Sequence, residues 1–98
     1  MTYYMLIYEV VDDYISRRAA FREEHLSHAE AAAARGELLL GGAFADPADR
    51  AVMVFRAKNA SVVEEFARQD PYVRKGLVKK WNVRPWTVVV GASAHPPR

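Results

Sequence analysis

A histidine and an aspartate in two separate segments are the residues of this chain best suited to chemistry. His25 lies in the segment 21–26, and Asp70 lies in the segment 69–77. If folding brings them together, the carboxylate fixes the imidazole tautomer and stabilises the protonated ring, which makes a general acid/base pair. Asp70 precedes Pro71, which disfavours helical geometry at Asp70 and lets its carboxylate turn toward a neighbouring element. We therefore predict catalytic roles for His25 and Asp70.

These residues also have structural interpretations. A histidine at the edge of a helix can serve only as a hydrogen-bonding residue, and Asp-Pro at a helix end commonly forms a turn. Arg22 lies one turn before His25, where it can bind an anionic oxygen, pair with Asp70 or extend its guanidinium past apolar surface into solvent. An unpaired charge on an apolar stripe is destabilising, which favours the first two roles for Arg22. The sequence leaves these alternatives open.

Glycines and a second histidine add further candidates. Gly41-Gly42 can let a ligand approach backbone N–H groups, or can mark a bulge or tight packing against the first helix. We predict Gly42 to be a substrate-binding residue. His25 and His28 are spaced like a metal pair, but they point about 60° apart on a helix and no third ligand is evident. We expect no metal and no other cofactor.

The composition bounds the class of protein. The chain has 98 residues, of which 51% are hydrophobic and 27% are charged, and this is typical of one globular domain. It has no cysteine, so disulfides and thiolate chemistry are excluded. No apolar run approaches the ~18 residues of a membrane span, and the start lacks the pattern of a signal peptide. We expect a cytoplasmic location, one domain over residues 1–91 and a flexible tail over 92–98.

A net charge of +2 is only weakly basic, and acids are mixed with the lysines and arginines over most of the chain. One basic cluster lies near Tyr72, Trp81 and Trp86, which is a composition compatible with a single-stranded nucleic-acid surface. The cluster consists of Arg74, Lys75, Lys79, Lys80 and Arg84. Its aromatic residues do not have the spacing of a known nucleic-acid module. We expect neither a nucleic acid nor a membrane as partner.

The hydrophobic pattern predicts the elements that carry these residues. Runs of aromatic and β-branched residues predict strands at 3–11, 38–44, 51–57 and 81–90. The segment 14–35 has no glycine or proline and is followed by Gly36, which is typical of a long helix with a glycine at its C-terminus. A second helix is expected over 61–68, with a turn of helix around 73–77 and Pro85 restricting the last strand to an edge or bulge.

Two details of the helices can be tested. In the first helix, one stripe is expected to face a sheet, and it consists of Ile15, Ala19, Leu26, Ala29 and Ala33, with Arg22 inside it and His25 at its edge. In the second helix, Ser61 and Glu64 have the spacing of a capping box. The buried positions expected there are Val62, Val63, Phe66 and Ala67.

The order of these elements is β-α-β-β-α-β, a split β-α-β arrangement in the α+β class with an antiparallel sheet and both helices on one face. The other face of the sheet is then apolar and uncovered. Two copies of the chain can bury it by packing face to face into a shared barrel-like core. We therefore predict a homodimer, with a cleft between the long helix and the sheet.

Four short motifs in this order carry a resemblance to a known family. They are Arg22-x-x-His25-Leu26, Gly36-Glu37-Leu38-Leu39-x-Gly41-Gly42, Asp70-Pro71-Tyr72-Val73-x-x-Gly76-Leu77 and Val83-x-Pro85-Trp86. Together they span most of the chain, and their order and spacing are similar to those of the YCII family (YciI-like proteins). The resemblance implies a ferredoxin-like fold of the dimeric α/β-barrel type.

The resemblance also implies an active site built around a histidine and an aspartate, which match His25 and Asp70 here, and Tyr72 of the same motif is a predicted substrate contact. The best-defined activity in the family is a dechlorinating, hydratase-like reaction on a chlorinated hydroxyquinol. We expect a cofactor-free lyase, hydratase or hydrolase that acts on a small substrate, for example an aromatic one. A dimer that only binds a small ligand, and a structural or regulatory dimer, are the alternatives left open.

Overall fold

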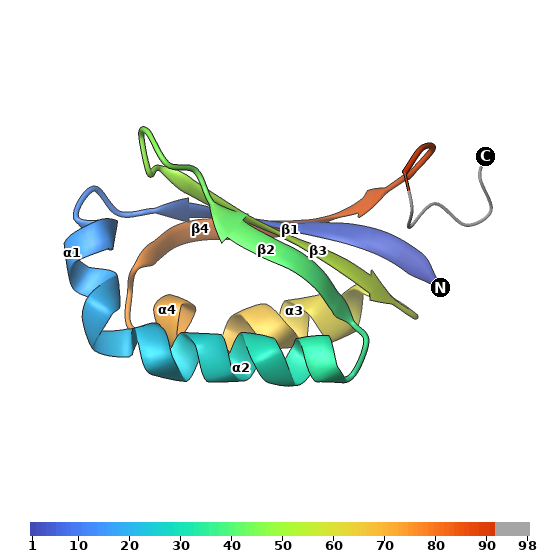
Figure 1. Cartoon of the computed structure of the whole chain (residues 1–98), viewed down its shortest axis with the longest axis horizontal. Coiled ribbons are helices and arrows are strands. Elements are labelled where there is room, and N and C mark those ends of the chain that lie inside the picture. Colours follow the sequence, from blue (N-terminus) through green and yellow to red (C-terminus); the bar gives the residue numbers. More distant parts are fainter. Residues whose placement is uncertain (92–98) are drawn as a thin grey trace.

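The computed structural model describes residues 1–91, in which four strands form one antiparallel sheet covered by helices on one face (Figure 1). The strands are β1 (Thr2–Val10), β2 (Leu38–Ala43), β3 (Arg50–Ala57) and β4 (Val78–Trp86), in the spatial order β2-β3-β1-β4. The helices are α1 (Tyr14–Arg18), α2 (Arg22–Ala34), α3 (Ala60–Gln69) and α4 (Pro71–Arg74), with a short 3-10 turn η1 (Ala19–Phe21). The predicted split β-α-β arrangement is confirmed.

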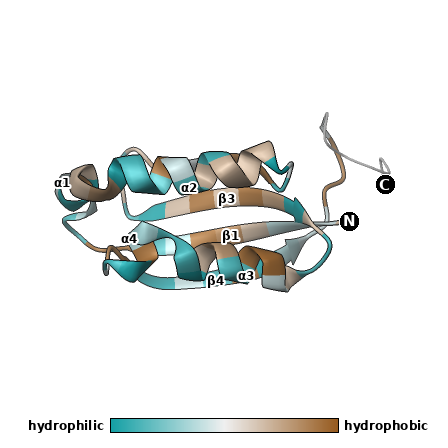
Figure 2. Ribbon diagram, turned by 90° about the horizontal axis from the view of Figure 1, so that it is seen from below, coloured by the Kyte–Doolittle hydropathy of each residue, from teal (hydrophilic) through white to brown (hydrophobic). Residues whose placement is uncertain are grey.

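The core lies between the sheet and the helices because the strands alternate between two faces. Along β1, Tyr4, Leu6 and Tyr8 are buried between the sheet and the helices. Their neighbours on β3 include Phe55, which is fully buried. From α3, Phe66 packs edge-on against Phe55 with ring centroids 5.0 Å apart. Figure 2 shows α2 and α3 on the same face of the sheet, with the hydrophobic centres of β1 and β3 visible between them.

The prediction of one continuous helix over 14–35 is wrong. The chain forms α1, passes through η1 and begins α2 at Arg22, with Phe21 at φ −120° where the helical path is interrupted. The two helices have different tasks: α1 descends from the end of the sheet to the helix layer, and α2 then runs beneath the sheet (Figure 1). A straight helix cannot do both, so the corner is made with a short 3-10 segment.

The corner also changes which residues face the core. The predicted stripe is partly wrong, because Ile15 is 52% exposed and Leu26 is 39% exposed, whereas Ala32 is fully buried. The stripe of α2 that packs inward contains His25 and His28 together with Ala32. Because the two histidines are polar, hydrophobic periodicity does not reveal that this face of α2 packs inward.

Smaller corrections concern the ends of elements. α3 begins at Ala60, before Ser61, and Ser61 Oγ donates a hydrogen bond to the Asn59 side chain in place of capping the helix. The single turn of helix falls on Pro71–Arg74, earlier than predicted, because proline is well suited to a first helical position. The last strand also ends earlier, at Trp86, and β4 is an edge strand as Pro85 led us to expect.

Of the helices within residues 1–91, none is long and apolar enough to cross a membrane. The cytoplasmic location stays a prediction of the sequence. The predicted flexible tail over 92–98 lies outside the described residues.

Candidate active site

Asp70 is positioned by the junction between two helices. It ends α3 with extended backbone angles (φ −65°, ψ 125°) and is at the same time the N-cap of α4, with Pro71 at the first helical position. Its Oδ1 accepts a hydrogen bond of 3.0 Å from the backbone N–H of Tyr72, which is a standard N-cap contact. The local sequence Asp-Pro-Tyr therefore ends one helix, begins the next and directs the carboxylate inward.

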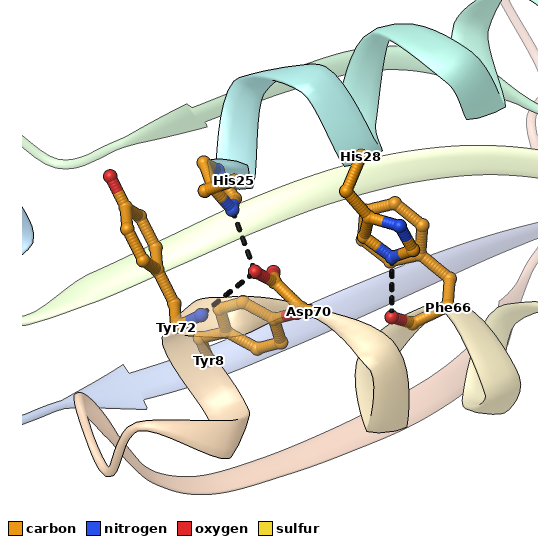
Figure 3. Close-up of polar contacts among 6 residues, drawn as sticks. All are labelled: Tyr8, His25, His28, Phe66, Asp70 and Tyr72. Atoms are coloured by element: carbon orange, nitrogen blue, oxygen red, sulfur yellow. Dashed lines mark hydrogen bonds and ion pairs between the residues drawn. The ribbon is translucent and has the colours of Figure 1, made fainter. Parts of the chain in front are cut away.

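The Asp70 carboxylate is fully buried and is surrounded by donors from three elements (Figure 3). In addition to the Tyr72 N–H from α4, the Tyr8 hydroxyl of β1 donates to Oδ2 at 2.7 Å. From α2, His25 Nδ1 lies 2.8 Å from Oδ1. Because an ionised carboxylate only accepts hydrogen bonds, Nδ1 carries the proton of the neutral ring and Nε2 holds a free lone pair.

His25 is held by stacking as well as by its hydrogen bond. Its imidazole lies parallel to the Tyr72 ring, with centroids 3.8 Å apart and planes 7° apart. Its side chain keeps 16% of its surface exposed, while Asp70 keeps none. The pair thus has one member sealed in the core and one that reaches the surface of a cavity, which is the arrangement that an orienting acid and a working base require.

His28 has a different task. Its Nε2 lies 2.9 Å from the Phe66 carbonyl oxygen, and its ring stacks on the Phe66 ring at 4.3 Å. Figure 3 shows the two histidines facing different partners, one at the end of α3 and one within it. His28 therefore joins α2 to α3 and takes no part in the Asp70 cluster.

A cavity of about 420 Å³ lies between α2 and the sheet, with His25 in its wall. This volume is in the range of small-molecule sites. One end is polar and is lined by Tyr8, Tyr14, Arg18, Arg22, His25 and Tyr72. Most of the rest is apolar and includes Leu26 and Ala29 of α2, Leu38 of β2 and Met53 of β3.

The predicted substrate contacts Arg22, Gly42 and Tyr72 all line this cavity together with His25, whereas Asp70 lies behind His25. One alternative for Arg22 is wrong: it forms no ion pair with Asp70, whose donors are Tyr8, His25 and the Tyr72 N–H. The premise that Arg22 is a charge on a buried stripe is wrong too, because it is exposed.

The two glycines of β2 differ from each other. A Cβ on Gly41 would come within 3.0 Å of Met53 Cγ, whereas one on Gly42 would meet nothing within 4 Å. Gly41 therefore permits close packing against β3, and Gly42 leaves open space beside the cavity. The register between β2 and β3 shifts between Leu38 and Leu40, so a bulge lies just before the glycines.

Sequence reasoning missed three residues of the polar end, namely Tyr8, Tyr14 and Arg18. Tyr8 had one available signal: it is an inward position of an alternating strand, and a tyrosine hydroxyl buried there needs a partner. Tyr14 and Arg18 gave no such signal, because the corner at η1 that brings α1 over the cavity is not visible in the helical pattern.

The two tyrosines nearest Asp70 remain protonated at ordinary pH. Burial, the negative charge of Asp70 and the hydrogen bond to it raise the pKa of Tyr8 far above its ordinary value of 10.0. Burial and the proximity of Tyr14 also raise the pKa of Tyr72, although the positive charges of Arg22 and Arg18 oppose this. Both hydroxyls are therefore available as donors.

A matched pair of variants tests this account of the buried hydroxyls. Tyr8→Phe removes one donor from a buried carboxylate, so we expect the free energy of unfolding to fall by about 1.5–3 kcal/mol. Tyr72→Phe is the control, because its buried hydroxyl has no hydrogen-bond partner among the described residues. We expect Tyr72→Phe to leave the free energy unchanged or to raise it. Urea denaturation measures both, and equal losses in the two variants would contradict the account.

The raised pKa of Tyr8 predicts that the stability of the fold decreases at alkaline pH. Because the pKa of Tyr8 is raised in the folded state, its contribution is fully present below pH ~10 and is lost as the pH rises above that value, where only the unfolded chain releases the proton. We expect the free energy of unfolding to fall there by up to about 1.4 kcal/mol per pH unit for this group. In Tyr8→Phe the decline should be shallower by that amount, and identical slopes in both proteins would rule this out.

Comparison with known proteins places this architecture. Among curated proteins, nothing matches the chain. The solved structures that resemble it include the following two. One is the 5-chloro-2-hydroxyhydroquinone dehydrochlorinase TftG from Burkholderia phenoliruptrix AC1100 in complex with 2,5-dihydroxybenzoquinone, with a TM-score of 0.73 and 16% identity over 86% of this chain and 92% of that one. The other is protein Atu4242 from Agrobacterium tumefaciens, with a TM-score of 0.57 and 14% identity over 88% and 91% of the two chains.

At these identities the two structures establish the shared ferredoxin-like fold alone. The family is established separately, because the model of the YCII-related domain matches residues 1–87. That match contains the four strands, the helices between them and every residue of the polar cavity end. The chain belongs to the YCII-related family.

Proposed function

We propose that this protein is a cofactor-free enzyme that acts on a small molecule by proton transfer, with His25 as general base and Asp70 as the residue that orients it. The observation that carries this proposal is the contact of 2.8 Å between His25 Nδ1 and a fully buried Asp70, at the wall of a cavity. With Nδ1 protonated and engaged, His25 has Nε2 available to accept a proton from a substrate or from water.

The reaction class that this arrangement favours is elimination, hydration or hydrolysis. Each of these needs a base of moderate strength, and none needs electrons to be supplied. The similar fold of TftG, a dehydrochlorinase, supports this choice, because loss of hydrogen chloride from an organic molecule requires removal of a proton as chloride leaves. Arg22, Gly42 and Tyr72 line the same cavity and contact the substrate in this proposal.

The base is tested with two histidine variants of the same helix. His25→Gln keeps a hydrogen-bonding side chain but removes the base, so we expect turnover to fall by about 10²–10⁴-fold. His28→Gln is the matched control, since His28 contacts Phe66 and has no contact with Asp70. Asp70→Asn should also lower turnover, because an amide can leave the ring in the wrong tautomer.

Turnover is measured by following chloride and proton release on a panel of halogenated hydroquinones and other acidic phenols, with thermal melts to show that each variant is folded. His28→Gln should retain the wild-type rate on a substrate that the protein converts. If His25→Gln retains that rate too, His25 is not the base.

We also propose that the protein is a homodimer formed through the uncovered face of the sheet. No helix within residues 1–91 covers this face (Figure 1), and its outward residues are apolar at the centre of the sheet, whereas those of β4 include Lys80, Asn82 and Arg84. The apolar residues include Met5 and Ile7 of β1, Val52 and Val54 of β3, and Leu40 of β2, which is 72% exposed. A self-complementary apolar face of this kind is suited to two-fold pairing.

A charge on that face tests the dimer. Val54→Glu should shift the mass measured by analytical ultracentrifugation from twice that of the chain to that of a single chain, because a carboxylate cannot be buried there without a partner. Lys58→Glu introduces the same side chain at an exposed site just after β3 and should leave the dimer intact. A monomeric wild-type protein would refute the proposal outright.

A further inference from the structure

Tyr72 carries a polar atom that the fold does not use. The residue is only 1% exposed, its ring is stacked on His25 and meets the Tyr14 ring edge-on at 5.7 Å, and its backbone N–H holds Asp70. Its hydroxyl, however, is the buried side-chain polar atom left without a hydrogen-bond partner in residues 1–91. Figure 3 shows this hydroxyl directed away from Asp70. A buried donor without a partner is destabilising, so its presence needs an explanation other than stability.

Two arginines lie at the same end of the cavity and are also unpaired. The ion pairs formed within residues 1–91 involve Arg17, Arg35 and Arg68 as their arginines, and neither Arg18 nor Arg22. The Arg18 guanidinium rests over the Tyr14 ring, 5.2 Å from its centroid, which fixes it beside the tyrosine cluster.

The field of both arginines reaches the unused hydroxyl. Their positive charges act to lower the pKa of Tyr72, against the larger effect of burial. The Arg22 guanidinium also lies near the Tyr72 hydroxyl, but their contact is not a hydrogen bond of ordinary geometry. A neutral donor and two cations therefore lie at the same end of the cavity.

No carboxylate of the cavity wall neutralises this end. The acidic side chain that lines the cavity is Glu30, which lies two turns of α2 beyond Arg22, about 12 Å along the helix. Asp70 is engaged by its own three donors. The polar end is thus a site for negative charge, while Leu26, Leu38 and Met53 line an apolar remainder.

We propose that this end of the cavity binds the anionic oxygen of a small organic acid, a carboxylate or an ionised phenol, whose apolar body lies between α2 and β2. The Tyr72 hydroxyl donates to that oxygen, and the Arg18 and Arg22 guanidinium groups balance its charge. Since the Tyr72 ring is stacked on His25, the bound anion lies next to the base. This inference rests on the proposed function and names its substrate class.

The test compares anions with neutral molecules of the same shape. Benzoate is paired with benzamide as the carboxylate source, and 2,4-dinitrophenolate is paired with 2,4-dinitroanisole as the phenolate source. Dissociation constants are measured by calorimetry on the full-length protein at neutral pH. We expect at least one anion to bind tenfold or more tightly than its neutral partner, and the source that does so identifies the natural charge group. Equal affinities within both pairs, or no binding of either anion, would overturn the proposal.

Three variants assign the effect to residues. Tyr72→Phe, Arg18→Gln and Arg22→Gln should each weaken binding of the preferred anion tenfold or more and leave the neutral partner within twofold. Arg17→Gln is the matched control, because Arg17 lies on α1 beside Arg18, is paired with Asp13 and does not line the cavity. Anion binding unaffected by all three changes would refute the assignment.

Binding in the His25→Gln background separates this inference from the proposed catalysis. The preferred anion should bind that variant within about threefold of the wild-type dissociation constant. If it does so while the wild-type protein turns over no substrate of the panel, the anion site stands and the enzymatic role falls. If turnover depends on His25 but neither anion binds more tightly than its neutral partner, the enzymatic role stands and the anion site falls.

Discussion

The buried carboxylate of Asp70 is the interaction on which the site depends. It draws a hydroxyl from β1, an imidazole from α2 and a backbone N–H from α4 to one point, so three elements far apart in the chain are fixed relative to one another. A buried charge is tolerated only when donors surround it, and here they do so completely. The same contacts that make the carboxylate acceptable in the core also determine which nitrogen of His25 is free.

Stability and function make opposite demands within this cluster. Tyr8 satisfies a buried oxygen and contributes to the stability of the fold, whereas the hydroxyl of Tyr72 is left unsatisfied a short distance away. Two tyrosines in similar surroundings thus serve different ends. A buried tyrosine hydroxyl without a partner lowers stability, and selection for stability alone would favour phenylalanine at that position. Its presence therefore points to a functional site.

The order of strands and helices, and the placement of both helices on one face, followed from the sequence because local pattern and turn residues agree along most of the chain. The pairing of His25 with Asp70 was suggested by the family motif and by the effect of Pro71, and periodicity alone would not have given it. The break at η1 and the inward stripe of α2 escaped detection. Both depend on tertiary demands, namely a corner at the end of the sheet and a polar core contact through His25 and His28, that no local propensity records.

The short helix α4 concentrates several tasks in one residue. The main-chain N–H of Tyr72 donates to the acid, its ring stacks on the base, and the residue lines the cavity. Because α4 has only four residues, no neighbouring turn can compensate for a shift in its start. An inserted or deleted residue between Asp70 and Tyr72 would move all three parts of the site at once, so the length of this tripeptide is constrained even where its surroundings are not.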